Sequence, residues 1–214
     1  MLFTRSSVFA VILLAAILSA CGEGGKPADQ TVVADTVSST RDTTPVAPAP
    51  VQPTPFAQVV RYEDKLSFSV SSPQLAEKNT LLIVPSGFTA SNDSILMDIE
   101  GTVLKAESVD INGDNSPELL VVTQDASNKG YAYVFSGNKN KSVSQVNIQD
   151  AGTSKGALDG YQGEDDYALV ESVLARRFPI YEGGTKTGKT RQIQYKLKNG
   201  EAMKQLVVDK VLTF

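Results

Sequence analysis

The stretch Leu66-Ser67-Phe68-Ser69-Val70-Ser71 alternates apolar and polar side chains with a period of two. Because successive side chains of a β-strand point to opposite faces, this alternation predicts a strand with one buried face and one face in water. The same period recurs in residues 131–135 and 192–197. Further short apolar runs that we interpret as strands are residues 81–84, 95–99, 103–109, 119–123, 143–148, 169–174 and 206–212.

Turn-forming residues separate these runs. Asn112-Gly113-Asp114, Gly183-Gly184 and Asn199-Gly200 are combinations that favour tight turns. Between the turns, no window of a dozen residues shows a helical stripe of apolar side chains. About ten short strands at this spacing predict an all-β domain over residues 56–214, built as an antiparallel sandwich or barrel around one ordinary core.

The N-terminus carries a different pattern. Arg5 precedes an apolar run over residues 8–18, which is too short to cross a bilayer as a helix. The run closes on Leu18-Ser19-Ala20-Cys21, the pattern of a bacterial lipoprotein signal that is cut before the cysteine. We therefore expect residues 1–20 to be a signal peptide and Cys21 to be acylated. An ordinary secretory signal with an incidental cysteine is the alternative.

Residues 21–55 are typical of a disordered tether. Pro, Thr, Ala and Val dominate its second part, which cannot bury enough apolar surface to fold. Several acyl chains on Cys21 would hold the protein firmly to a membrane. Because no aspartate follows Cys21 directly, we expect the outer membrane, with the domain in the periplasm or at the cell surface.

Composition excludes several kinds of site. The chain has no histidine and a single cysteine, so His-dependent nucleophilic catalysis and zinc or copper sites lack their ligands. An internal disulfide is excluded for the same reason. The formal net charge of −4 becomes one unit more negative when the signal peptide, with Arg5, is removed. Such an acidic chain is not expected to bind nucleic acid, and it favours cationic partners.

Two catalytic motifs occur in a context that contradicts them. Residues 183–190 match the phosphate-loop pattern, but that chemistry needs a helix after the loop, and residues 192–197 alternate as a strand. We interpret the segment as a glycine-rich, basic hairpin loop. Residues 136–139 and 186–188 fit the S-x-x-K and K-T-G motifs of penicillin-binding enzymes, without the helical half that those enzymes require.

The segment Asp110–Glu118 has the spacing of a calcium loop. Asp110, Asn112, Asp114 and Glu118 supply oxygen at positions one, three, five and nine, followed by an apolar strand. Calcium takes about six to eight oxygen ligands, so these side chains with backbone and water would suffice. The alternative is an Asx-rich turn held by hydrogen bonds from side chains to the backbone.

Several segments together resemble the periplasmic inhibitors of i-type (invertebrate-type) lysozyme. The resemblance spans most of residues 56–214 and none of the tether, and its most specific parts are Arg176-Arg177-Phe178-Pro179 and Arg191-Gln192-Ile193-Gln194-Tyr195. The other segments that carry it are residues 104–114 and 116–118, 160–163 with Asp165, 170–171 with Leu174, 180–181, 196–197 and 200–202. It implies an antiparallel β-sandwich of about eight to ten short strands that blocks the cleft of an i-type lysozyme and that could form a homodimer.

The resemblance also implies which residues bind the enzyme. In the family, a loop rich in Ser and Gly that ends near a Tyr enters the cleft, and the corresponding region here is residues 126–131. Ser127 and Asn128 would contact the enzyme's carboxylates, Lys129 would add a positive charge, and Tyr131 would act as an anchor. The chain departs from the family's Ser-Gly-Ser-Tyr pattern. Tyr131 could instead pack on the sheet as part of an ordinary hairpin.

Three readings of function follow. The first is an envelope-tethered lysozyme inhibitor, the second a calcium-stabilised adhesion or carbohydrate-binding module, and the third a structural lipoprotein. We expect no enzymatic activity and no cofactor other than calcium. The acidic run Glu164–Asp166 is interpreted as a solvated loop. Arg176 and Arg177 are consecutive on a strand and should point to opposite faces, one of them into a structural salt bridge.

Overall fold

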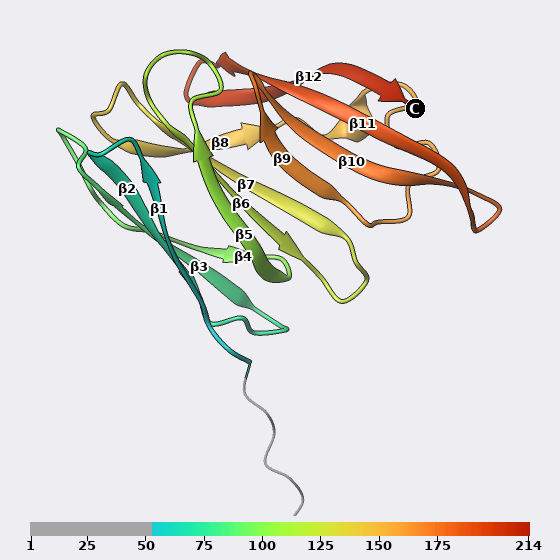
Figure 1. Ribbon diagram of the computed structural model, residues 1–214, viewed down its shortest axis with the longest axis horizontal. Coiled ribbons are helices and arrows are strands. Elements are labelled where there is room, and N and C mark those ends of the chain that lie inside the picture. The colour runs from blue at the N-terminus through green and yellow to red at the C-terminus, as the bar shows by residue number, and fades with distance from the viewer. Residues whose placement is uncertain (1–52) are drawn as a thin grey trace, which may run out of the picture. The chain divides into compact units, whose positions relative to one another are not determined.

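The computed structural model describes residues 53–214, which form twelve β-strands and one turn of 3₁₀ helix (Figure 1). The predicted signal peptide, Cys21 and most of the predicted tether lie outside the described residues. The first sheet contains β1 (Phe56–Tyr62), β2 (Leu66–Ser72), β3 (Asn79–Ser86) and β4 (Ile95–Ile99), in that order. The remaining elements are β5 (Thr102–Val109), β6 (Glu118–Gln124), β7 (Gly130–Gly137), β8 (Val143–Ile148), η1 (Ala151–Thr153), β9 (Asp166–Val170), β10 (Val173–Glu182), β11 (Thr185–Asn199) and β12 (Lys204–Thr213).

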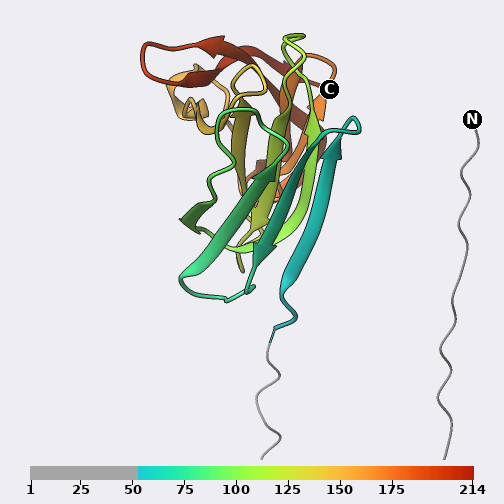
Figure 2. The ribbon, with the colours of Figure 1, turned by 90° about the vertical axis from the view of Figure 1, so that its left-hand side faces the viewer.

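The second sheet has eight strands in the order β5-β6-β7-β8-β12-β11-β10-β9. It curves until its two edge strands meet, and Leu169 of β9 donates its backbone N–H to Glu107 of β5 at 3.0 Å. The first sheet packs against β5, β6 and β7 of this curved sheet. Figure 2 shows the blue-green strands of the first sheet beside the second sheet.

Two hydrophobic cores result, and β6 takes part in both. Leu119 and Val121 pack between the two sheets, whereas Leu120 and Val122 point into the interior of the curved sheet. All four side chains are at most 2% exposed. Because successive side chains of a strand point to opposite faces, one continuous apolar run contributes alternate residues to the two cores.

The predicted all-β sandwich is confirmed, with three differences. The structure has twelve strands rather than eight to ten. Residues 169–174 are not one strand but the hairpin of β9 and β10, because Glu171 takes a positive φ of 52° and turns the chain. The pairing of β12 with β8 is parallel, although the other strand pairs are antiparallel.

The segment that matches the phosphate loop belongs to a hairpin, as predicted, but only its first two residues form the turn and residues 185–190 are part of strand β11. Gly183 and Gly184 form the turn between β10 and β11, both with positive φ, and Thr185 already begins β11. No helix follows, so no helix N-terminus is available to hold a phosphate. Within residues 53–214, no helix is long and apolar enough to cross a membrane.

Candidate functional site

The connection between β6 and β7 is a tight five-residue loop, residues 125–129. The backbone N–H of Asp125 donates to the carbonyl of Lys129 at 3.0 Å, and that of Asn128 donates to the carbonyl of Asp125 at 3.1 Å. Asn128 has a φ of 63°, a left-handed conformation that asparagine tolerates better than most residues. The loop therefore has a defined conformation of its own.

The carboxylate of Asp125 holds this conformation. Its Oδ1 accepts hydrogen bonds from the backbone N–H of Ser127 (2.8 Å), the hydroxyl of Ser127 (2.6 Å) and the backbone N–H of Lys129 (3.0 Å). Its Oδ2 accepts from the hydroxyl of Tyr131 at 2.9 Å. These bonds, led by that from the Ser127 hydroxyl, lower the pKa of Asp125 to about 2. Burial and the bond to Asp125 raise the pKa of Tyr131 to about 12.

The structure brings the four predicted binding residues together but gives them two different roles. Ser127, Asn128 and Lys129 are exposed and form the tip of the loop. Tyr131 is half-buried at the base, with its hydroxyl committed to Asp125 and the ammonium of Lys129 5.0 Å from the centre of its ring. Asp125 itself was missed, although an aspartate at the start of a turn commonly accepts from the backbone N–H two residues on, as Asp125 does from Ser127.

A second segment, residues 163–165, braces the loop from one side. Glu164 donates its backbone N–H to the carbonyl of Asn128 at 2.7 Å. Gly130 donates its backbone N–H to Oδ2 of Asp165 at 2.9 Å. The approach is so close that a Cβ on Gly130 would lie 2.7 Å from Cβ of Asp165, so only glycine fits here.

Asp165 is the centre of a buried polar cluster. The guanidinium of Arg176 donates from Nε to Asp165 Oδ1 at 2.7 Å, and the hydroxyl of Tyr161 donates to Oδ2. The Arg176 guanidinium also lies 4.8 Å from the ring centre of Tyr161 and 5.4 Å from that of Phe178. Burial and the hydrogen bond to Asp165 raise the pKa of Tyr161.

This cluster corrects one prediction and confirms another. The interpretation of residues 164–166 as a solvated loop is wrong for Asp165, whose side chain is fully buried because Arg176 neutralises it. The structural salt bridge expected for one arginine of the pair is confirmed. Arg177 lies on the opposite face of β10 and donates from Nε to Gln192 at 2.6 Å.

A cavity of about 230 Å³ borders the loop. It lies where β7 and β8 separate, because their pairing extends only to Val134 and Val146 and β8 then pairs with β12. Gly130 and Tyr131 form one side of the cavity, and Arg176 also lines it. The loop, the buried cluster and the cavity thus form one continuous region at the end of β6.

The acidic loop of residues 110–118 lies at the other end of β6. Its Asp110 carboxylate accepts from four backbone N–H groups: Oδ1 accepts from Asn112 (3.1 Å), Gly113 (2.7 Å) and Asp114 (3.3 Å), and Oδ2 from Asn115 (2.8 Å). The side-chain oxygen of Asn112 accepts from the backbone N–H of Asp114 at 2.9 Å. These are the bonds of an Asx-rich turn.

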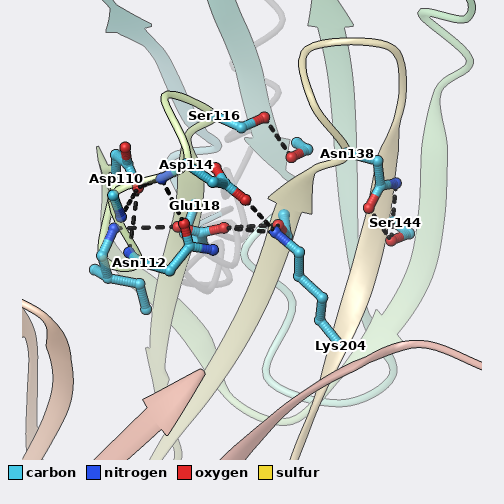
Figure 3. A network of polar contacts seen from close by, with 12 residues as sticks. Asp110, Asn112, Asp114, Ser116, Glu118, Asn138, Ser144 and Lys204 are labelled. Carbon is cyan, nitrogen blue, oxygen red and sulfur yellow. Dashed lines mark hydrogen bonds and ion pairs between the residues drawn. The ribbon is translucent and has the colours of Figure 1, made fainter. Parts of the chain in front are cut away.

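The other two predicted calcium ligands face a lysine (Figure 3). The ammonium of Lys204 lies 3.0 Å from Asp114 Oδ2 and 3.5 Å from Glu118 Oε1, and it donates to the hydroxyl of Ser136 at 2.9 Å. Glu118 is fully buried and accepts from the hydroxyl of Ser136 (2.6 Å) and the backbone N–H of Ile111 (3.1 Å). Burial raises the pKa of Glu118.

The predicted calcium ligands therefore do not converge on one point. Asp110 and Asn112 accept from the backbone, whereas Asp114 and Glu118 face an ammonium. Over the described part of the chain, no three His, Cys, Asp or Glu side chains form a group that could hold a metal ion. Calcium binding remains a prediction, and this arrangement of donors does not favour it.

Comparison with known proteins adds no assignment. A scan against models of protein families finds no match to this chain, and no curated protein matches it.

Proposed function

We propose that this protein is an envelope-tethered inhibitor of i-type lysozyme, and that the loop of residues 125–129 enters the enzyme's active-site cleft. The observation that carries the proposal is the exposed polar tip, Ser127, Asn128 and Lys129, held in one conformation by the Asp125 carboxylate. The resemblance of residues 56–214 to the inhibitors of i-type lysozyme supplies the partner.

The chemistry of the tip suits such a cleft. Glycosidases of this kind cleave their substrate between two carboxyl groups. The amide of Asn128 and the ammonium of Lys129 are donors for which carboxylates are the natural acceptors, whereas the hydroxyl of Ser127 donates its proton to Asp125 and helps to fix the tip. Because the loop is already ordered by Asp125, little conformational entropy would be lost on binding. The ordered loop and its hydrogen-bond donors together favour insertion into the cleft over a flexible surface contact.

The position of the tether bears on how the loop would be presented. β1 begins at Phe56, which pairs with Ser72 at the end of β2, and the hydroxyl of Ser72 donates to Asn79. The side-chain amide of Asn79 donates in turn to the carbonyl of Gly101. The Cα of Gly101 lies so close to the carbonyl of Gln124, at the end of β6, that a Cβ there would clash with it. The chain therefore enters the domain at the end that carries the loop. A tether of residues 22–55 with a reach of about 30 Å would leave an enzyme room to approach this end.

The remaining parts of the proposal concern location. Acylation of Cys21 would anchor the chain, and we place it at the outer membrane because no aspartate follows the cysteine. The domain would then stand between an invading lysozyme and the peptidoglycan.

The test is a lysis assay in which the lipid-free chain, residues 22–214, is titrated into lysozymes of the i, c and g types. Stoichiometric loss of i-type activity is expected, and both Lys129→Ala and Asn128→Ala should weaken it. Lys141→Ala is the matched control, because Lys141 is exposed beyond the other end of β7. Absence of i-type inhibition at micromolar excess would refute the proposal, and equal loss in the Lys141 control would refute the assignment of the loop.

A further inference from the structure

We propose that the ammonium of Lys204 serves as the cation of the acidic loop of residues 110–118, in place of the divalent ion that the spacing of the loop predicts. The inference is independent of the proposed lysozyme inhibition. It concerns two of the four predicted calcium ligands, Asp114 and Glu118, and the lysine that faces them in Figure 3.

The contacts of Lys204 are those of a buried counter-ion. Its Nζ is within 3.5 Å of an oxygen of Asp114, Glu118 and Ser136. Only 15% of the Lys204 side chain is exposed, and the Glu118 side chain is fully buried. Lys204 is the first residue of β12, some ninety positions beyond the loop in sequence, so only the folded sheet brings the charges together.

One ammonium here faces two carboxylates. If Lys204 were absent, Asp114 and Glu118 would be left without their shared cation, and burial would penalise the unpaired carboxylate of Glu118, whereas that of Asp114 is partly exposed. Carboxylate and hydroxyl oxygens around such a gap are ligands of the kind that calcium prefers. The loop should therefore accept calcium only when the lysine is removed.

The other half of the loop opposes calcium in the native chain. The Asp110 carboxylate already accepts from four backbone N–H groups, which direct positive partial charge at its oxygens. Calcium would have to displace the ammonium of Lys204 and also compete with these donors. The domain should therefore keep its fold at any calcium concentration, including in the presence of a chelator.

The experiment measures the melting temperature of the wild-type chain and of Lys204→Met, in EDTA and in millimolar calcium near neutral pH. The wild type is expected to melt at the same temperature in both. Lys204→Met is expected to melt roughly 10 °C lower in EDTA, because it leaves a buried ion pair broken, and to recover several degrees in calcium but not in sodium chloride of equal ionic strength.

Two further variants make the result specific. Lys204→Arg keeps a cation and should remain insensitive to calcium. Lys196→Met removes a lysine from the more exposed ion pair with Asp209 and should gain no calcium response. Calcium-dependent melting of the wild type, or heat of calcium binding to it in a titration, would overturn the proposal. So would a Lys204→Met chain that gains nothing from calcium or that folds in neither condition.

Discussion

The buried carboxylate of Asp165 offers the sharpest test of how the structure supports its loop. Asp165→Ala would leave the guanidinium of Arg176 without its anionic partner, and would remove the acceptor of the Gly130 N–H and of the Tyr161 hydroxyl. The Asp165 side chain is fully buried and that of Arg176 is only 11% exposed, so water can replace the lost contacts only in part.

The expected loss follows from the burial. Removing one partner of a buried ion pair typically costs about 3–5 kcal/mol, because the other charge stays buried and unpaired. For a domain of this size each kcal/mol lowers the melting temperature by about 2–4 °C, so a fall of roughly 10 °C is expected. The free energy of unfolding from urea titration, with melting by circular dichroism, measures both quantities.

The control is the neighbouring aspartate. Asp166→Ala removes an equal charge from an exposed position and should change the free energy of unfolding by about 0.5 kcal/mol or less. If the free energy of unfolding of Asp165→Ala lay within about 1 kcal/mol of that of the wild type, the buried Arg176 would not depend on Asp165 as its counter-ion, and the reasoning above would be wrong. Amide exchange at Gly130 gives a local readout, and it should quicken in Asp165→Ala but not in Asp166→Ala.

Three other outcomes are expected. Asp125→Ala should abolish the proposed lysozyme inhibition with little change in melting temperature, since it frees only the loop, and narrowed NMR lines at Ser127 would report the added motion. Because the pKa of Asp125 is lowered to about 2 from its usual 3.8, the loop should stay ordered above about pH 4 and lose order as pH falls toward 2, which the same NMR signals measure. Leu119→Ala and Leu120→Ala should each cost about 2–5 kcal/mol in urea titration, although they lie in different cores, and a small effect of either would contradict the placement of β6 in both.

The fold was predictable where the pattern is local. The alternation at residues 66–71 predicts β2 with its buried and more exposed faces. In a sheet with one buried face, apolar and polar residues alternate along each strand, so the burial pattern can be read from the sequence. The run at residues 119–122 predicts a strand, but all four residues are apolar. The sequence therefore does not show which face of the strand packs in which of the two cores. The turn at Glu171 was missed, because it uses a non-glycine residue with positive φ and carries no Gly or Pro signal.

The candidate site, too, has a part that could be predicted from the sequence and a part that could not. The tip residues Ser127, Asn128 and Lys129 could be proposed from a contiguous segment. The environment of Asp165 could not, because its partner Arg176 reaches it only through the pairing of β9 with β10. In the sequence Asp165 and Asp166 are equivalent acidic residues, and tertiary structure alone buries one and exposes the other.

The two loops at the ends of β6 are held in their conformations by the same kind of contact. A chain with one cysteine has no internal disulfide with which to fix a loop. In both loops an aspartate carboxylate instead gathers backbone N–H groups: Asp125 between β6 and β7, and Asp110 between β5 and β6. Each carboxylate fixes the conformation of its own loop, as a bound ion or a disulfide would in another protein. It does so at any pH at which the carboxyl group stays ionised. A loop built in this way is already ordered without a partner, which is the property that the proposed plug for an enzyme cleft would require.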